Sequence, residues 1–472
     1  MLETPRVSTA IAAPASGHTV RRYWVLVAVA VGSMMSGLDS GISNTVLPVI
    51  ASSLGVDVAS AQWVVAIYVL VLSCLLLAFG RLGDLYGYRR TYLSGFGLFV
   101  VASATCAFST NIGMLVAARG VQAIGAAMLA ANSPAILINA FPEQQRGRAL
   151  GFQATAVYLG LAIGPSLGGW LTAVFGWGAV FLVNVPIGLA DLLLGSRVIP
   201  RDRRLVKNGE SFDFTGAALF TVALLVLIFG LNQVHDWGWT SPLLTASMLA
   251  AALAFGAFIV VERHAIAPLL DLHLFTSREF SASVASATLQ YTAVFSMQFL
   301  LPFYLIQARG LSVGIAGLVL TAQPVVMACT APFSGALSDR LGARLPATFG
   351  MAIIAVGLGL LSRLGLDTPL PAIVAVLLLI GAGVGLFTAP NMSAALGAVP
   401  GMRRGVASGV LATARNVGMV LGIGIGGALF TSILAANGAA PVPEVIVAAA
   451  TVGLSAAAVI AVIGTMTSAA AR

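Results

Sequence analysis

Two charged side chains lie inside stretches that otherwise carry no charge, Asp39 in 23–50 and Arg119 in 113–133. An ionised carboxylate at the centre of a bilayer costs about 2.5–3.5 kcal/mol even on the lenient insertion scale, so we expect Asp39 to face a wet cavity or to be protonated. A carboxylic acid withdrawn from water holds its proton more readily, which is the property that a proton carrier needs. The alternative is a structural acid that is bonded to a neighbouring helix.

Arg119 is the other buried charge of the N-terminal half. A guanidinium does not deprotonate usefully, so its role would be to hold a carboxylate as an anion until protonation releases it. The alternative is that Arg119 extends to the nearby outer surface, because it lies close to the outer end of its stretch.

Asp191 is a second acid in an apolar stretch, 179–198. It falls on one helical face with Asn184, Gly188 and Gly195, and such a polar, small stripe suits a cavity or a tight helix interface. Arg197 is close enough in sequence to form a salt bridge with it. A role in proton coupling and a structural role are equally open for Asp191.

A short pattern rich in glycine and charge occurs twice, at 80–89 and 335–344, an offset of 255 residues (335 − 80). Each copy ends one apolar stretch and precedes another, which is typical of a tight connection between two membrane helices in a duplicated transporter. The aspartate can meet a helix N-terminus or nearby arginines, and the glycine permits the turn. We interpret the two copies as a hinge or latch, made of Gly80, Asp84, Gly87 and Arg89 and of Gly335, Asp339, Gly342 and Arg344.

The elements that position these residues must be membrane helices. The chain is 59% hydrophobic and 8% charged, with a mean hydropathy of +0.99, a composition that lipid solvates and water does not. Each crossing needs roughly 20 apolar residues, which gives about fourteen spans. They lie near 23–50, 60–80, 92–110, 113–133, 150–174, 179–198, 214–234, 242–261, 280–306, 313–334, 346–362, 370–389, 406–434 and 445–466.

The net charge of +8 follows from topology rather than from nucleic-acid binding. If the N-terminus is cytosolic, the outer loops receive only Arg309 and Arg363, and the other arginines outside the spans fall on the cytosolic side, as the positive-inside rule requires. Both termini and both hinges are then cytoplasmic. We expect a disordered tail at 1–20, a six-helix bundle at 21–198, a linker with two extra membrane helices at 199–278 and a second six-helix bundle at 279–472.

Several motifs, taken in order and spacing, make the chain resemble the major facilitator superfamily, specifically its fourteen-span bacterial drug:proton antiporter family. The resemblance covers nearly everything from Tyr23 to about 466. Its motifs lie at 38–48, 63–68, 80–90, 119–122, 160–169, 181–188 and 415–418. It implies an all-α fold of two six-helix bundles plus two extra helices, with alternating access to a central cavity.

The resemblance also implies roles. The acid matching Asp39 takes part in proton coupling and cation recognition, the arginine matching Arg119 in proton transfer, and the first hinge in closing the cytoplasmic side. Ala123 departs from the glycine usual in the family. Small residues and a helix-bending proline in span five match an antiporter hallmark that links a kink to exchange. This run consists of Gly160, Gly164, Pro165, Gly168 and Gly169.

Polar residues in apolar spans are candidates for the substrate pathway, although most such residues form hydrogen bonds between helices. These candidates are Asn44, Gln122, Gln153, Tyr158, Gln290, Tyr291, Gln298, Asn391 and Asn416. Arg415 matches a family position, and we interpret it as an anchor or gate near the cytoplasmic end. With Asp39 and Asp191 as the only buried acids, neutral or monocationic substrates are favoured over divalent cations.

Other activities lack support in the sequence. No phosphate-binding loop occurs and the single lysine, Lys207, lies in the linker, so ATP-driven transport is not expected. No cluster suggests a catalytic residue, a metal or a cofactor. We expect a monomeric, proton-coupled efflux antiporter of the bacterial inner membrane that exports a small amphipathic or hydrophobic drug or antibiotic. A solute importer or a lipid exporter on the same fold remains open, and an integral-membrane enzyme or receptor fits less well.

Overall fold

The computed structural model describes residues 16–56, 58–201, 212–232, 238, 241–265, 268–270, 272–436 and 442–470. Most of the predicted tail 1–20 and the linker around Lys207 lie outside the described residues. Throughout the described ranges the regular structure is helical, with no strand.

The first half of the chain folds into a bundle of long helices joined by short turns. In chain order its elements are α1 (Ser16–Leu54), α2 (Val58–Tyr86), α3 (Tyr88–Ala107), α4 (Ile112–Ala140), η1 (Glu143–Gln145), α5 (Arg146–Phe175), α6 (Ala179–Leu182) and α7 (Asn184–Val198). Local chemistry sets some of these bounds. The side chain of Asn111, for example, accepts a hydrogen bond of 2.9 Å from the Met114 amide and caps the start of α4.

An extra pair of helices and a second bundle follow. These elements are α8 (Phe214–Asn232), α10 (Pro242–His264), η2 (Leu272–Thr276), α11 (Arg278–Phe303), the π-helical η3 (Tyr304–Ala308), α12 (Val313–Leu341), α13 (Arg344–Leu361), α14 (Leu370–Gly397), η4 (Gly401–Arg403), α15 (Arg404–Ala436) and α16 (Pro443–Ala469). The second bundle has its own apolar core, built from residues between 293 and 461.

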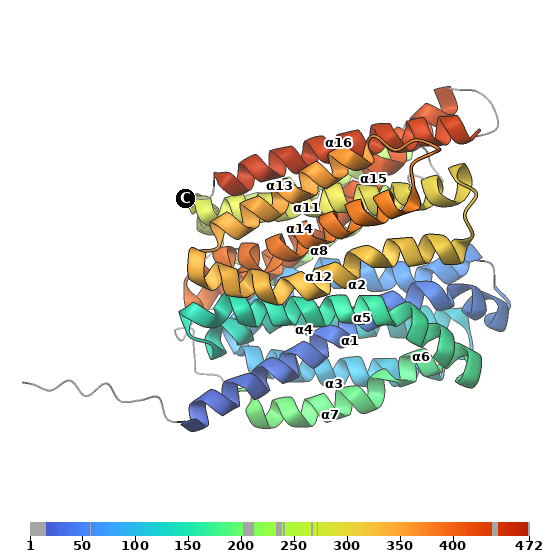
Figure 1. Ribbon diagram of the computed structural model, residues 1–472. Coiled ribbons are helices and arrows are strands. Elements are labelled where there is room, and N and C mark those ends of the chain that lie inside the picture. The colour runs from blue at the N-terminus through green and yellow to red at the C-terminus, as the bar shows by residue number, and fades with distance from the viewer. Residues whose placement is uncertain are drawn as a thin grey trace, which may run out of the picture.

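The predicted all-α membrane fold is confirmed. Within the described part of the chain, twelve helical segments are long and apolar enough to cross a membrane. The two remaining predicted spans, 92–110 and 214–234, fall on helices α3 and α8, which are not among these twelve, and the predicted span 179–198 is divided between α6 and α7. Figure 1 shows the long helices running side by side, with the first turn of α1 and the last turn of α16 at the same end of the molecule.

The extra pair lies against one side of the two bundles. Helices α8 and α10 pack on each other, and α8 also contacts α2 and α15, which belong to different bundles. The rings of Trp63 and Phe229 stack across the α2–α8 contact with centroids 6.1 Å apart. On the other side of the bundles, α5 and α12 form the corresponding contact between the two halves.

Helices α1 and α5 approach each other closely along a row of glycines. A Cβ atom added at Gly37 would lie 2.3 Å from the Val157 carbonyl oxygen, and one added at Gly160 would lie 2.3 Å from the Met34 carbonyl oxygen. Such contacts exclude any larger side chain. Because Gly37 lies two residues before Asp39, this row of glycines fixes the position of the helix that carries the buried acid.

Candidate functional site

Asp39 on α1 and Arg119 on α4 form a buried ion pair. The distance between Arg119 Nη1 and Asp39 Oδ2 is 2.7 Å, and the two side chains are 1% and 2% exposed. Arg119 therefore does not extend to the surface, which was the alternative left open by its sequence position. The carboxylate is paired within the protein, so both charges are compensated where water is absent.

Polar groups from three further helices surround the pair. The amide of Gln122 accepts from Arg119 Nη1 at 2.7 Å and donates to Asp39 Oδ1 at 3.3 Å. Asn184, the first residue of α7, donates to the same oxygen at 3.4 Å. Arg119 Nε donates to the Val64 carbonyl oxygen of α2 at 3.1 Å, and Gln122 Nε2 donates to Ser103 Oγ of α3 at 2.8 Å.

Aromatic rings enclose the guanidinium. The Cζ atom of Arg119 lies 4.2 Å from the ring centroid of Tyr68 and 5.5 Å from that of Phe181. Cation–π contacts of this kind contribute up to about 2 kcal/mol when they are desolvated. If Asp39 became protonated, Arg119 would lose its counter-charge while still buried.

A cavity of about 160 Å³ lies between the two bundles, next to this cluster. Its lining residues come from α1, α3, α4 and α5 of the first bundle and from α11, α14 and α15 of the second. Ser36 lines it, whereas Asp39, about 4.5 Å further along the axis of α1 at 1.5 Å per residue, does not. In this conformation the ion pair is separated from the cavity by roughly one helical turn.

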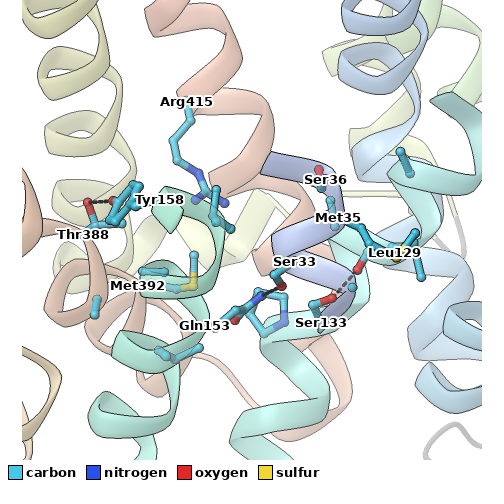
Figure 2. Close-up of a pocket in the computed structure, with 18 of the residues that line it drawn as sticks. Ser33, Met35, Ser36, Leu129, Ser133, Gln153, Tyr158, Thr388, Met392 and Arg415 are labelled. Atoms are coloured by element: carbon cyan, nitrogen blue, oxygen red, sulfur yellow. Dashed lines mark hydrogen bonds between the residues drawn. The ribbon is translucent and has the colours of Figure 1, made fainter. Parts of the chain in front are cut away.

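Polar side chains line the cavity from both bundles, as Figure 2 shows. The Tyr158 hydroxyl of α5 donates to Thr388 Oγ1 of α14 at 3.1 Å, which joins the two bundles. The Gln153 amide donates to Ser33 Oγ at 3.2 Å. Tyr291 also lines the cavity, so three of the predicted pathway candidates lie here.

The remaining pathway candidates lie elsewhere. Asn391 borders a smaller adjoining pocket, Gln290 is buried among helices, and Gln298 is exposed. Asn416 donates to Ser73 Oγ at 2.9 Å and thereby links α15 to α2. Gln122 belongs to the ion-pair cluster, and the side chain of Asn44 lies outside the described residues.

Arg415 is a cavity residue that the sequence analysis assigned to a different place. Its side chain extends from α15 into the space between the bundles (Figure 2) and not toward the cytoplasmic end of its helix. The position of Arg415 in the sequence could have predicted this location. Arg415 follows Arg404, the first residue of α15, by about 16 Å of helix at 1.5 Å per residue, which is near the middle of a bilayer.

Asp191 is buried without a partner. It lies on the predicted stripe, since Asn184, Gly188, Asp191 and Gly195 are the buried residues of α7. Neither carboxylate oxygen of Asp191 has a hydrogen-bond partner among the described residues, so the salt bridge with Arg197 does not form. Asp191 does not line the cavity.

The first hinge holds the two bundles together at one end. The Asp84 carboxylate accepts hydrogen bonds from the backbone amides of Gly405 at 2.8 Å and Val406 at 2.9 Å, at the start of α15. Gly80 permits the approach, because an added Cβ atom would lie 2.3 Å from the Gly405 carbonyl oxygen. A carboxylate at a helix N-terminus is stabilised by the free amides and by the helix dipole.

The second hinge repeats this geometry in the opposite direction. The Asp339 carboxylate accepts from the amides of Gly147 at 2.8 Å and Arg148 at 2.9 Å, at the start of α5. A Cβ atom added at Gly335 would lie 2.0 Å from the Gly147 carbonyl oxygen. The sequence did not identify these partner residues at the starts of α5 and α15. A shared signal was present, because Gly147-Arg148 and Gly405-Val406 each follow an arginine that begins the helix.

The last residues of each hinge have structural roles within their own bundle. Gly87 and Gly342 have φ angles of +105° and +82°, which few residues other than glycine adopt. Arg89 donates to the Ser196 carbonyl oxygen near the end of α7, and Arg344 donates to the Ala469 carbonyl oxygen at the end of α16. Each arginine thus caps the last helix of its bundle.

Most of the small residues in the predicted antiporter run of α5 face α1. Cβ atoms added at Gly164 and Gly168 would meet Gly41 and Ile42 of α1 at 3.0 and 2.8 Å. Pro165 lies inside α5. Gly169 has nothing within 4 Å of an added Cβ atom, so it takes no part in this contact.

Two helical bundles around a central cavity define a membrane transporter, and comparison with known proteins identifies its family. The model of the Major Facilitator Superfamily matches residues 29–287 and 283–467. The chain belongs to this superfamily.

Individual relatives are transporters of different compounds. The chain is 35% identical over 420 residues to the riboflavin transporter RibZ of Clostridioides difficile (strain 630), covering 88% of this chain and 90% of the relative. It is 34% identical over 414 residues to the multidrug resistance protein Stp of Mycobacterium tuberculosis (strain CDC 1551 / Oshkosh), covering 87% of this chain and 76% of the relative. Further relatives are named for antibiotic resistance or multidrug efflux.

A solved structure supports the fold. The proton:xylose symporter XylE aligns with a TM-score of 0.65 at 14% identity, covering 95% of each chain. The relatives are membrane transporters, and no catalytic family is indicated.

Proposed function

We propose that the protein is a proton-coupled efflux antiporter that exports a small amphipathic or hydrophobic compound, such as a drug or antibiotic, by alternating access. The observation that carries this proposal is the buried Asp39–Arg119 pair, one helical turn from the cavity. Drug-resistance relatives such as Stp support export. The proposed setting is the bacterial inner membrane, with a monomeric transporter whose termini and hinges face the cytoplasm.

The proposed coupling step is a competition for Asp39. A proton that reaches the carboxylate neutralises it, and Arg119 then loses the partner that compensates its charge. Gln122, which contacts both members of the pair, is able to stay bonded to Arg119 while α1 moves. The glycine contact between α1 and α5 transmits this movement to the helix that bears Gly147 at its start, one of the two latch sites.

The two hinges define which conformation is present. With both aspartates bonded across the bundles, the end that carries the hinges is closed. In the proposed topology this is the cytoplasmic side. Substrate release then occurs at the opposite side, and opening of both latches returns the cavity to the cytoplasm. The proposed division of the chain is 21–198 and 279–472 for the two moving bundles, with 199–278 as the extra pair.

Import of a solute is the second candidate, because one relative, RibZ, is named as a riboflavin transporter and not as a resistance or efflux protein. The two functions differ in direction relative to the proton gradient. In everted membrane vesicles acidified inside, an antiporter accumulates its substrate. A proton-coupled importer releases the substrate under the same gradient.

The decisive variant is Asp39→Asn, with Asp191→Asn as the matched control. Both remove a buried carboxyl group from the first bundle, but only Asp39 is paired with a cation. We expect Asp39→Asn to lower proton-driven uptake of dyes and antibiotics into everted vesicles at least 100-fold, while Asp191→Asn stays within threefold of the unmodified protein. Wild-type uptake by Asp39→Asn would exclude this carboxylate from coupling.

A further inference from the structure

The side chain of Arg415 brings a positive charge to the central cavity. Arg415 lines both the main cavity and the smaller adjoining pocket, together with Tyr291, Thr388 and Met392. Its Nε donates a hydrogen bond to the Leu411 carbonyl oxygen of its own helix, at 3.3 Å. The guanidinium therefore lies where the two pockets meet, and most of its five N–H donors are not used by this bond.

No protein carboxylate compensates this charge. Among the described residues no acidic side chain lines either pocket, and Arg415 forms no ion pair with them. Asp39 is engaged by Arg119, and Asp191 is buried on α7 away from the cavity. A guanidinium in a cavity between membrane helices needs an anion or an electron-rich partner to offset its loss of water.

The rest of the lining suits an aromatic molecule. Tyr158 comes from the first bundle and Tyr291 from the second, and Met35 and Met392 lie among them. Tyrosine rings stack on aromatic ligands, and methionine adapts to rings of different shape. Both bundles therefore offer apolar and aromatic contacts around a single positive charge.

Building on the export function proposed above, we propose that the substrate class is a small aromatic compound with a carboxylate or another anionic group, and that Arg415 binds this group. A guanidinium presents a planar fork of donors that matches a carboxylate. Bound this way, the anion neutralises the cavity, whereas a cationic compound is repelled. This specificity differs from the neutral or monocationic substrates expected from the sequence, because neither Asp39 nor Asp191 lines the cavity.

The test compares three probes that share one fluorophore. Dansylglycine carries a carboxylate, dansylglycinamide is its neutral amide, and dansylcadaverine carries an ammonium group. Binding to the purified full-length protein in detergent is measured by dansyl fluorescence at pH 7.5 with no gradient. We expect the carboxylate to bind about tenfold more tightly than the amide, as for one charge-assisted pair, and the ammonium probe to bind most weakly.

Variants locate the preference. Arg415→Gln should bring the affinities of the carboxylate and the amide within twofold of each other, and Arg415→Lys should keep part of the difference because it keeps the charge. Arg363→Gln, an exposed arginine outside the cavity, is the matched control for net charge and should behave as the unmodified protein. Size-exclusion profiles and thermal unfolding establish that each variant is folded.

Each outcome decides the proposal. It is overturned if the unmodified protein prefers the amide or the ammonium probe, if none of the three probes binds, or if Arg415→Gln keeps the preference. The order of the three affinities in the unmodified protein is informative even if Arg415→Gln does not fold. Proton-driven transport in proteoliposomes is measured separately. The hypothesis that Asp39 couples transport to protons can be wrong while the preference for an anion is right, and the preference can be wrong while the coupling is right.

Discussion

The two hinges have the same contacts but different surroundings. Asp84 and Asp339 each bind two consecutive backbone amides at the start of a helix in the other bundle, with equal pairs of distances of 2.8 and 2.9 Å. Asp84 is 1% exposed, whereas Asp339 is only partly buried. The shared geometry therefore serves to hold the bundles together, and the surroundings determine how strongly each hinge does so.

Two features distinguish the surroundings of the first hinge. The Tyr88 hydroxyl lies 2.6 Å from Asp84 Oδ1 and 3.1 Å from the Gly401 carbonyl oxygen, while the second hinge has Ala343 at the corresponding position. The extra helices also differ, because α8 packs beside the α2–α15 contact and not beside the α5–α12 contact. We infer that the second latch opens before the first.

Opening is measurable by distances between spin labels at exposed positions next to each latch. One pair is Tyr86 with Met402, and the other is Gln144 with Leu341. The labels are placed in a protein whose Cys74, Cys106 and Cys329 have been replaced.

The largest effect is expected for Asp84→Ala. It removes a buried carboxylate that accepts three hydrogen bonds, a loss of about 3 kcal/mol, or roughly a 100-fold decrease in the ratio of closed to open hinge end. The Tyr86–Met402 distance distribution should shift to the longer, open component. An unchanged distribution would show that Asp84 does not hold the bundles closed.

Asp339→Ala should have a smaller effect, because its carboxylate is already partly hydrated. We expect a loss of about 1.5 kcal/mol, roughly tenfold in the same ratio, measured with the Gln144–Leu341 pair. If Asp339→Ala opens the protein as far as Asp84→Ala does, the two latches are equivalent and the order of opening inferred here is wrong.

Tyr88→Phe makes the first hinge resemble the second. It deletes one hydroxyl and keeps the ring, so the expected loss is about 1 kcal/mol, or about fivefold in the closed-to-open ratio. The measurement is again the Tyr86–Met402 pair. Added to Asp84→Ala, the same substitution should cost less, since only the contact with the Gly401 carbonyl oxygen is left to lose.

Arg344→Gln should have the smallest effect. The residue caps the end of α16 within one bundle and does not cross to the other. We expect a cost of about 0.5 kcal/mol from the lost interaction with the helix terminus, visible as a slightly lower thermal unfolding temperature with unchanged spin-label distances. A change in the distances would place this residue in the latch itself.

Several features of the site follow from spacing and type of residue. The repeated hinge predicted a carboxylate at a helix N-terminus, and both aspartates lie there. The stripe of small and polar residues on α7 is the buried face of that helix. These predictions succeed because the 3.6-residue period decides which side chains share a face.

Other features depend on which helices become neighbours. The sequence suggested that Arg119 holds a carboxylate, but it did not predict that Gln122 contacts both members of the Asp39–Arg119 pair. Nor did it predict that the carboxylate of Asp191 has no hydrogen-bond partner among the described residues. Likewise Arg415 is a charge in an apolar stretch by sequence, and only its place between the bundles makes it part of the cavity.

By itself, the sequence determined the membrane environment, the helical class and the duplicated hinge, because hydropathy, helical period and repeated motifs are local properties of the chain. The tertiary structure alone decided which buried charge is compensated and which faces a cavity. That distinction depends on contacts between helices distant in sequence, and in a low-dielectric interior the same charged residue type acts differently according to those contacts.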